Sequence, residues 1–446
     1  VVDIDGAVDM ATTLTVAGNV DFNGDLDVDG TSNLDAIDVD GAANFAADVT
    51  FADGADIITA SAGTSNTRVG VNAGNSIASG GNYNVVVGDE AGTALTTGDN
   101  NVAVGYESLT TEDAHGFNVA VGYRALKTQN AGADAYNVAV GADAGVLVTT
   151  GVANTLIGAL TGDALTDADF NVAVGHQALT TDTLGSRSTA IGYFALQTQN
   201  FTTATDSYNT AVGFNSGGAI TTGIQNTLIG GLAGDALTDA DFNVAIGIST
   251  LSSDTKGNRN VAIGYAALET QNFTTSTDSY NTAVGALAGL SVTTGTNNTL
   301  VGGLAGDALT DADLNVAVGD NALSADTLGS RSTAIGRSAL SSQNFTTATD
   351  TYNTAVGFNA GTAVTTGKEN TLIGGLAGDA LTTGSNNVAV GFEALSTEDA
   401  HGNNVAVGNR ALKTLNAGAA GLNVAVGDDA GLSVTTGVGN TFVGGL

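Results

Sequence analysis

The sequence predicts an all-β protein whose main part is a parallel β-solenoid, and three observations support this. A five-residue motif, with Asn or Ser, Thr or Val, any residue, Val or Ile, then Gly, occurs 22 times in the 446 residues. Its copies begin about 17 to 21 residues apart, which is too short for a helical-hairpin repeat. The β-branched residues precede Gly and polar turn residues, a pattern typical of short strands joined by turns. We therefore expect each unit to form one coil of a stacked array.

The spacing of the motif defines the solenoid and a longer period within it. The commonest interval is the one from 101 to 118, but every fourth interval from 118 onward is longer, as from 188 to 209. Asn137, Asn209, Asn281 and Asn353 therefore recur with a superperiod of about 72 residues. We assign residues 63–446 to the solenoid, in which coils about 4.8 Å apart would build a rod of roughly 100 Å. The motif begins at 66, 84, 101, 118, 137, 154, 171, 188, 209, 226, 243, 260, 281, 298, 315, 332, 353, 370, 387, 404, 423 and 440.

Residues 1–62 follow a different pattern. Turn glycines recur there at shorter intervals, between alternating apolar and acidic residues as in LDVDG and IDVDG. Alternation interrupted by Gly indicates short strands. Because this segment is as acidic as it is apolar, we expect a short-strand β-shaft of intertwined chains.

The polar and glycine positions of the motif have structural roles. Asn opens 20 of the 22 copies, and the other two open with Ser188 and Ser332. Stacked Asn side chains would form a ladder of hydrogen bonds between coils, and the invariant Gly would occupy a turn with positive φ or a close backbone approach. The representative ladder and turn residues are Asn101, Asn118, Asn137, Asn209, Asn281, Asn353, Gly105, Gly122 and Gly141.

The apolar positions lead to a prediction about partner chains. Positions two and four of the motif share one face of the strand, and we expect this β-branched face to fill the core. Position three, usually Ala, would then face outward, where a polar residue is expected. Another copy of the chain would have to cover it, and a bundle of three is our expectation. Replacing Ala103 and Ala120 with Glu should then dissociate chains more than it unfolds coils.

Composition excludes several classes of function. The chain has 11 basic and 45 acidic residues, a net charge of −34, which disfavours nucleic acid and anionic membranes as partners. It has no Cys, and no apolar run approaches the length of a membrane span. Its three His residues do not combine with Ser and Asp at one recurring locus. We therefore expect neither membrane insertion nor an enzyme.

The repeated motifs NVAVG, STAIG and NTAVG, followed by segments such as YESL and YRAL, resemble the head repeats of YadA-like trimeric autotransporter adhesins. The resemblance covers residues 66–446 and implies a left-handed parallel β-roll, a homotrimer and binding to host surface molecules. The units here are longer than that family's usual repeat. The first segment, with LTVAGNVDFNGDLDVDGTSNL, is similar to shaft segments of marine bacteriophage tail fibres.

Three long loops recur with the superperiod, at 197–208, 269–280 and 341–352. Their aromatic residues could contact a repeating glycan through ring faces about 19 Å apart. The alternative, which we favour, is that each loop folds back on its own coil or on a neighbouring chain. The candidate receptor residues are Phe201, Tyr208, Phe273, Tyr280, Phe345 and Tyr352.

Paired aspartates in the LTDADFN and LTDADLN segments are the candidate metal ligands. Carboxylate oxygens suit Ca²⁺, but two carboxylates alone are too few. We favour the alternative that these residues form solvated acidic turns without a metal ion. A melting temperature that depends on calcium would contradict this alternative. We expect no other cofactor. The residues are Asp167, Asp169, Asp239, Asp241, Asp311 and Asp313.

These observations together favour an extracellular structural protein. The leading hypothesis is a fibre segment of a phage tail fibre or surface adhesin, which holds a recognition tip away from its anchor. The alternative is that the periodic outer loops themselves bind a host receptor or glycan. A polysaccharide-degrading tailspike would need larger coils and a cleft with paired carboxylates.

Overall fold

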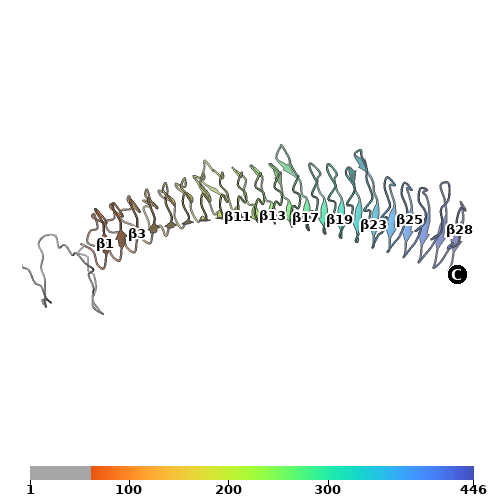
Figure 1. Ribbon diagram of the computed structural model, residues 1–446, viewed down its shortest axis with the longest axis horizontal. Coiled ribbons are helices and arrows are strands. Elements are labelled where there is room, and N and C mark those ends of the chain that lie inside the picture. The colour runs from red at the N-terminus through yellow and green to blue at the C-terminus, as the bar shows by residue number, and fades with distance from the viewer. Residues whose placement is uncertain (1–61, 446) are drawn as a thin grey trace, which may run out of the picture. The chain divides into compact units, whose positions relative to one another are not determined.

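The computed structural model describes residues 62–445, which form a parallel β-solenoid (Figure 1). All regular elements in this part of the chain are short strands, and none is a helix. The prediction of an all-β parallel solenoid with about 22 coils is confirmed. The β-shaft predicted for residues 1–62 lies outside the described residues, apart from Ala62.

Each motif contributes one three-residue strand to a single 22-stranded sheet. Successive strands are parallel and in register, so that Ala103 lies beside Ala120, for example. The strands are β1 (Thr67–Val69), β2 (Val85–Val87), β3 (Val102–Val104), β4 (Val119–Val121), β5 (Val138–Val140), β6 (Thr155–Ile157), β7 (Val172–Val174), β9 (Thr189–Ile191), β11 (Thr210–Val212), β12 (Thr227–Ile229), β13 (Val244–Ile246), β15 (Val261–Ile263), β17 (Thr282–Val284), β18 (Thr299–Val301), β19 (Val316–Val318), β21 (Thr333–Ile335), β23 (Thr354–Val356), β24 (Thr371–Ile373), β25 (Val388–Val390), β26 (Val405–Val407), β27 (Val424–Val426) and β28 (Thr441–Val443).

Three two-stranded parallel sheets accompany the main sheet, one at each of the long loops. In each, the second strand belongs to the loop and pairs with a segment of the coil before it. The pairs are β8 (Gly185–Ser186) with β10 (Thr205–Asp206), β14 (Gly257–Asn258) with β16 (Thr277–Asp278), and β20 (Gly329–Ser330) with β22 (Thr349–Asp350).

The strands face the opposite way from the sequence-based prediction. In β13 the central Ala245 is fully buried, whereas Val244 and Ile246 on either side of it are partly exposed. The same holds along the stack, including Ala103 and Ala120, which are 0% exposed. The prediction that the β-branched pair fills the core is therefore wrong, and the Ala face is not a surface for another chain.

The reason is the narrow interior of each coil. In coils with Ala at the centre of the strand, a Leu on the following turn often fills the space opposite, as Leu251 does for Ala245. Where the strand centre is Leu228, the corresponding residue is Gly234, and a Cβ there would lie 2.9 Å from Leu228 Cδ2. No coil among the described residues therefore has a large aliphatic residue at both positions, because two would overfill the core.

Asparagine side chains join the coils in a ladder. The backbone N–H of Asn243 donates to Asn226 Oδ1 (3.0 Å), and that of Asn260 donates to Asn243 Oδ1 (2.9 Å). Asn243 Nδ2 donates to the Gly257 carbonyl (2.9 Å), which precedes β15 in the next coil. Each amide therefore satisfies buried backbone groups at the junction between its own coil and the one that follows.

The two serines interrupt this ladder, and loop residues bridge the gap. Ser188 Oγ lies 2.6 Å from Ser207 Oγ, and Gln199 Nε2 donates to Ser188 Oγ (2.8 Å). Gln199 Oε1 in turn accepts from Asn209 Nδ2 (2.9 Å). The long loops thus supply the polar groups that the shorter Ser side chain lacks. The same arrangement occurs two superperiods later with Ser332, Gln343, Thr351 and Asn353.

The glycine that closes the motif meets both expected constraints. Gly105, Gly122 and Gly141 have φ between 131° and 144°. A Cβ on Gly122 would lie 2.3 Å from the carbonyl oxygen of Gly141 in the next coil. A larger residue is therefore excluded by backbone conformation and by the coil spacing together.

Candidate binding surface

The three long loops fold back onto the solenoid around a buried carboxylate. Asp182 accepts backbone N–H groups of Gly185 (3.0 Å) and Phe201 (3.1 Å) on Oδ1 and the side-chain amide of Gln199 (2.6 Å) on Oδ2. Asp254 and Asp326 play the same part in the other two loops. A buried carboxylate that accepts three N–H groups has its hydrogen-bonding capacity well satisfied. It therefore fixes the position of the first residues of each long loop.

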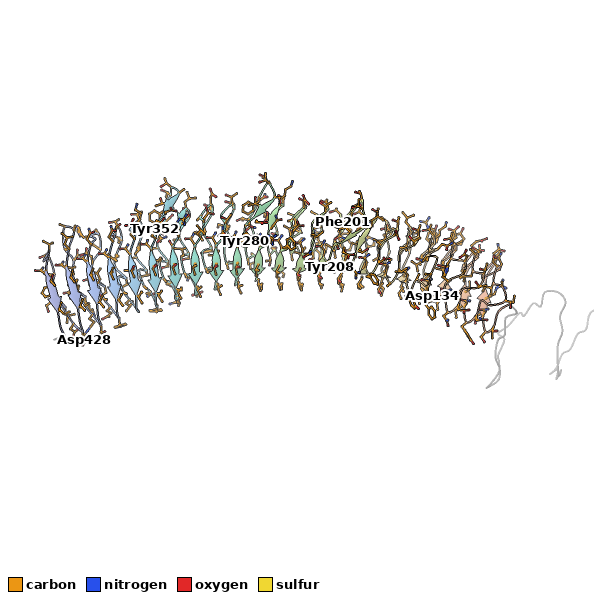
Figure 2. The ribbon with its side chains drawn as sticks, turned by 180° about the vertical axis from the view of Figure 1, so that it is seen from behind. Asp134, Phe201, Tyr208, Tyr280, Tyr352 and Asp428 are labelled. Carbon is orange, nitrogen blue, oxygen red and sulfur yellow. The ribbon has the colours of Figure 1, made fainter. Side chains whose placement is uncertain are left out.

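This folding divides the predicted aromatic row into two groups. Phe201, Phe273 and Phe345 are only 6–7% exposed. Tyr208, Tyr280 and Tyr352 are more than half exposed and follow one another along the stack (Figure 2). A ligand can therefore reach the tyrosine rings without any change in the loops, but it cannot reach the phenylalanine rings.

An arginine that sequence reasoning missed lies beside each of these tyrosines. The guanidinium carbon of Arg187 is 4.7 Å from the ring centroid of Phe170 and 5.9 Å from that of Tyr208. Arg187 Nε also lies 3.0 Å from Asp206 Oδ2. The stack of one arginine between two aromatic rings is held by cation–π attraction as well as by the ion pair.

The stack recurs four coils further on and, in part, four coils beyond that. Arg259 lies 4.6 Å from the ring centroid of Phe242 and 5.9 Å from that of Tyr280. Arg331 lies 6.0 Å from the Tyr352 centroid, and Leu314 replaces the phenylalanine. The signal in the sequence is an Arg directly before the motif in the coil that precedes each long loop.

Local backbone conformation directs these side chains outward. The residue before the motif has positive φ, with values of 59° for Phe170, 62° for Arg187 and 50° for Tyr208. A non-glycine residue in this left-handed region is uncommon. Its repetition in register lines up side chains from successive coils along one edge of the sheet, where they stack on one another.

A second row lines the other end of the strands, at the residue after the motif glycine. The ring centroids of Tyr106 and Tyr123 are 5.7 Å apart, and those of Tyr193 and Phe214 are 5.6 Å apart, with nearly parallel planes. His176 stacks on Tyr193 at 5.4 Å. Between the two rows lies the outer face of the main sheet, where β-branched residues such as Ile157 and Ile229 are 38–39% exposed.

The paired aspartates hold neighbouring coils together in the described structure. Asp239 Oδ1 accepts from Thr222 Oγ1 (2.8 Å), and Asp241 Oδ1 accepts from the Ile224 N–H (2.8 Å) in the preceding coil. Within residues 62–445, groups of three or more metal-ligating side chains occur at 112–115 and 398–401, and neither includes these aspartates. The other two pairs, Asp167 and Asp169 and Asp311 and Asp313, accept equivalent hydrogen bonds from the preceding coil.

Another row of aspartates has raised pKa values. Burial raises the pKa of Asp163, Asp235, Asp307 and Asp379, which recur with the superperiod. Oδ1 is buried without a hydrogen-bond partner in Asp235, Asp307 and Asp379. The uncharged acid is thus favoured at these places relative to the unfolded chain.

We expect the protein to become more stable as the pH falls from about 7 toward about 4, the ordinary range of an aspartate pKa. A carboxyl with a raised pKa binds more protons folded than unfolded, so its contribution to stability declines as the pH rises through the folded-state pKa. Lower repulsion within a chain of net charge −34 acts in the same direction. Thermal melting at both pH values measures the effect. A combined Asp235→Asn, Asp307→Asn and Asp379→Asn variant should show a smaller difference, and an unchanged difference would contradict this origin.

The part of the chain that the structure describes contains no helix with the length and hydropathy needed to span a membrane. Comparison of the chain with models of protein families, with curated protein sequences and with solved structures yields no match.

Proposed function

We propose that this chain is a structural fibre segment of a phage tail fibre or a surface adhesin, where it acts as a rigid extracellular spacer in attachment. The observation that carries the proposal is the unbroken register of the 22-stranded sheet, from β1 to β28. Every coil repeats the same core and ladder, so the array has the one-dimensional build of a solenoid. Fibrous and adhesive segments typically have this architecture.

The proposal predicts the length of the particle. Twenty-one steps of about 4.8 Å give a rod of roughly 100 Å for the solenoid. Negative-stain electron microscopy of the purified chain measures this length directly. Compact particles without a long axis would contradict the spacer role.

We further propose that three copies associate in the fibre. The surface that supports this is the outer β-branched face of the main sheet, which replaces the Ala face proposed from the sequence. Its half-exposed Val and Ile residues continue from coil to coil, and a contiguous apolar surface of this kind marks an interaction site.

Sedimentation equilibrium tests the number of chains. We expect a mass three times that of the single chain, and we expect an Ile229→Glu, Ile246→Glu variant to sediment as a monomer with unchanged circular dichroism. The added carboxylates would be buried unpaired only in the assembly. A monomeric wild-type protein would contradict the trimer without affecting the solenoid.

The second candidate function is binding of a receptor or glycan by the loop surface. It is favoured by the exposed Tyr208, Tyr280 and Tyr352, each beside an arginine and spaced four coils apart. Aromatic rings and guanidinium groups suit the faces and hydroxyls of a repeating sugar chain.

A triple Tyr208→Ala, Tyr280→Ala, Tyr352→Ala variant tests this candidate. We expect it to lose binding to a glycan array that the wild-type protein recognises, by at least about tenfold for the loss of three stacking contacts. The matched control replaces Tyr106, Tyr123 and Tyr265, which are exposed outside the loops. Equal losses in the two variants would contradict a role for the loops.

A further inference from the structure

Two copies of the loop TEDAHG, near either end of the solenoid, bring together side chains of the kinds that bind metal ions. In each copy one atom from a Glu, an Asp and a His lie within 4.8 Å of one another. The Glu is buried in both, whereas the His is partly exposed. The first copy contains Glu112, Asp113 and His115, and the second contains Glu398, Asp399 and His401.

The first copy contains polar atoms that the protein leaves unpaired. The Glu112 side chain is 0% exposed, and its Oε2 has no hydrogen-bond partner. His115 Nδ1 is also buried without a hydrogen bond and lies 3.5 Å from Glu112 Oε1. An unpaired buried carboxylate oxygen is costly.

Other coils show how the same position is satisfied by protein groups alone. Asp182 occupies it in a coil that precedes a long loop, and Gln199 in the next coil donates to its second oxygen (2.6 Å). The coil that follows the first TEDAHG loop has the corresponding Gln129, but Nε2 of this residue has no hydrogen-bond partner. The His and the adjacent Asp occur only in the two coils that carry Glu, and not in the three that carry Asp.

The preceding coil and the first residue of its own coil hold the backbone of the first loop in place. Thr96 Oγ1 donates to the Asp113 carbonyl (2.8 Å), and Asn101 Nδ2 donates to the His115 carbonyl (3.0 Å). The three side chains therefore start from fixed positions on a rigid support, which favours binding because little ordering is required. The partial exposure of Asp113 and His115 leaves a path from solvent.

We propose that Glu112, Asp113 and His115 bind a divalent transition-metal ion of the zinc class. One imidazole nitrogen and two carboxylate oxygens form a mixed donor set that Zn²⁺ accepts, with water as a fourth ligand. Ca²⁺ and Mg²⁺ bind through oxygen and gain nothing from the imidazole. The ion joins three side chains of one turn and neutralises a buried carboxylate. Its role is therefore to stabilise this coil, independently of the attachment function proposed above.

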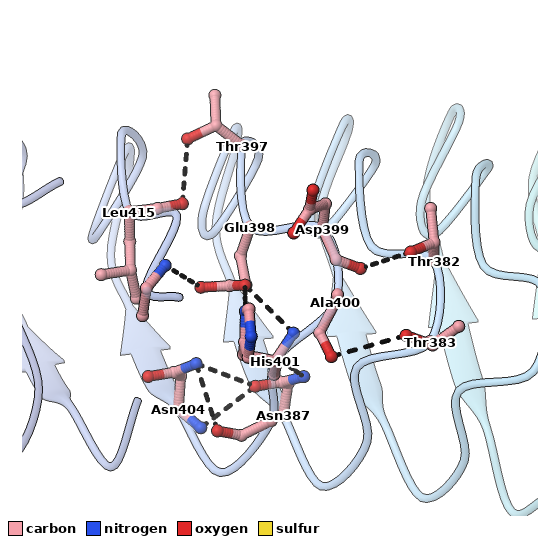
Figure 3. Close-up of polar contacts among 12 residues, drawn as sticks. Thr382, Thr383, Asn387, Thr397, Glu398, Asp399, Ala400, His401, Asn404 and Leu415 are labelled. Atoms are coloured by element: carbon pink, nitrogen blue, oxygen red, sulfur yellow. Dashed lines mark hydrogen bonds and ion pairs between the residues drawn. The ribbon is translucent and has the colours of Figure 1, made fainter. Parts of the chain in front are cut away.

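The second loop provides an internal comparison, because its carboxylate is already satisfied. Glu398 Oε1 accepts from the His401 N–H and lies 3.1 Å from His401 Nδ1, and Oε2 accepts from the Ala417 N–H (3.0 Å) (Figure 3). Leu415 replaces the glutamine found at 129. A metal ion would have to break these contacts, so this loop should bind zinc more weakly than the first.

Calorimetric titration of the tag-free, chelator-treated full chain with ZnCl₂ tests the proposal, with CaCl₂ and MgCl₂ run in parallel. We expect one tight zinc equivalent that neither of the other ions reproduces. His115→Ala should weaken it by at least about 100-fold, the upper range for loss of a supporting residue in a metal site. His176→Ala is the matched control and should leave the tight phase unchanged, since His176 stacks on Tyr193 outside the cluster.

Two further measurements separate a metal site from a folding defect. Circular dichroism of metal-free His115→Ala should match the wild type. If it does not, Asp113→Asn, which keeps the side-chain shape, replaces it in the titration. Co²⁺ absorption should show a coordinated ion in the wild type and not in the variant. Zinc binding that is unchanged in both variants, or that Ca²⁺ matches in affinity, would overturn the proposal, as would loss of the tight phase in His401→Ala alone.

Discussion

Replacing Ala245 with Glu is expected to unfold the coils around β13 and to lower the free energy of unfolding there by about 4 kcal/mol or more. Ala245 is fully buried at the strand centre, and Leu251 on the following turn is also fully buried. A Glu side chain at this position overfills the narrow coil and places a carboxyl group among aliphatic residues. Hydrogen exchange of the coils on either side measures the loss locally, because a solenoid need not unfold as one unit.

The neighbouring substitution Val244→Glu is the matched control. Val244 is partly exposed on the outer face of the same strand, so its carboxylate remains hydrated in the single chain. We expect nearly unchanged hydrogen exchange but altered sedimentation if that face contacts other copies. Ala103→Glu and Ala120→Glu should behave like Ala245→Glu. Folded but dissociated Ala→Glu variants would contradict the orientation of the strands and restore the sequence-based prediction.

Asn243→Ala is expected to produce the second largest effect, a loss of about 2–5 kcal/mol for two buried backbone groups left without partners. The groups are the N–H of Asn260 and the carbonyl of Gly257, both bonded to the Asn243 amide. Thermal melting followed by circular dichroism, together with hydrogen exchange at Asn260, reports the change.

The control is Asn409→Ala, an exposed asparagine whose amide also reaches the next coil. Its Nδ2 donates to Asp428 Oδ1 (2.9 Å) at the surface, where water replaces a lost bond. We expect a change within about 0.5 kcal/mol. Equal effects of the two substitutions would mean that the ladder contributes no more than surface hydrogen bonds do.

The long loops show how far the sequence predicts a candidate site. Their period and their aromatic residues are visible in the letters, and the tyrosines do lie exposed. The burial of Phe201 depends on its N–H bond to Asp182 in the preceding coil. The stack of Arg187 between Phe170 and Tyr208 likewise joins three successive coils. Contacts of this kind join residues of different coils and depend on the distance between the coils. The sequence of a single repeat unit does not reveal them.

The sequence by itself determined the coil repeat, the strand positions, the asparagine ladder and the turn glycine, because each depends on local conformation or on stacking of identical residues in register. Only the tertiary structure decided which side of each strand faces the core. Alternation places positions two and four opposite position three, but it does not state which side is inside. The width of the coil decides this, because its interior has room for at most one large aliphatic side chain of that coil at the level of the strand centre. Ala245 therefore lies inward beside Leu251, and the bulkier Val244 and Ile246 lie outward.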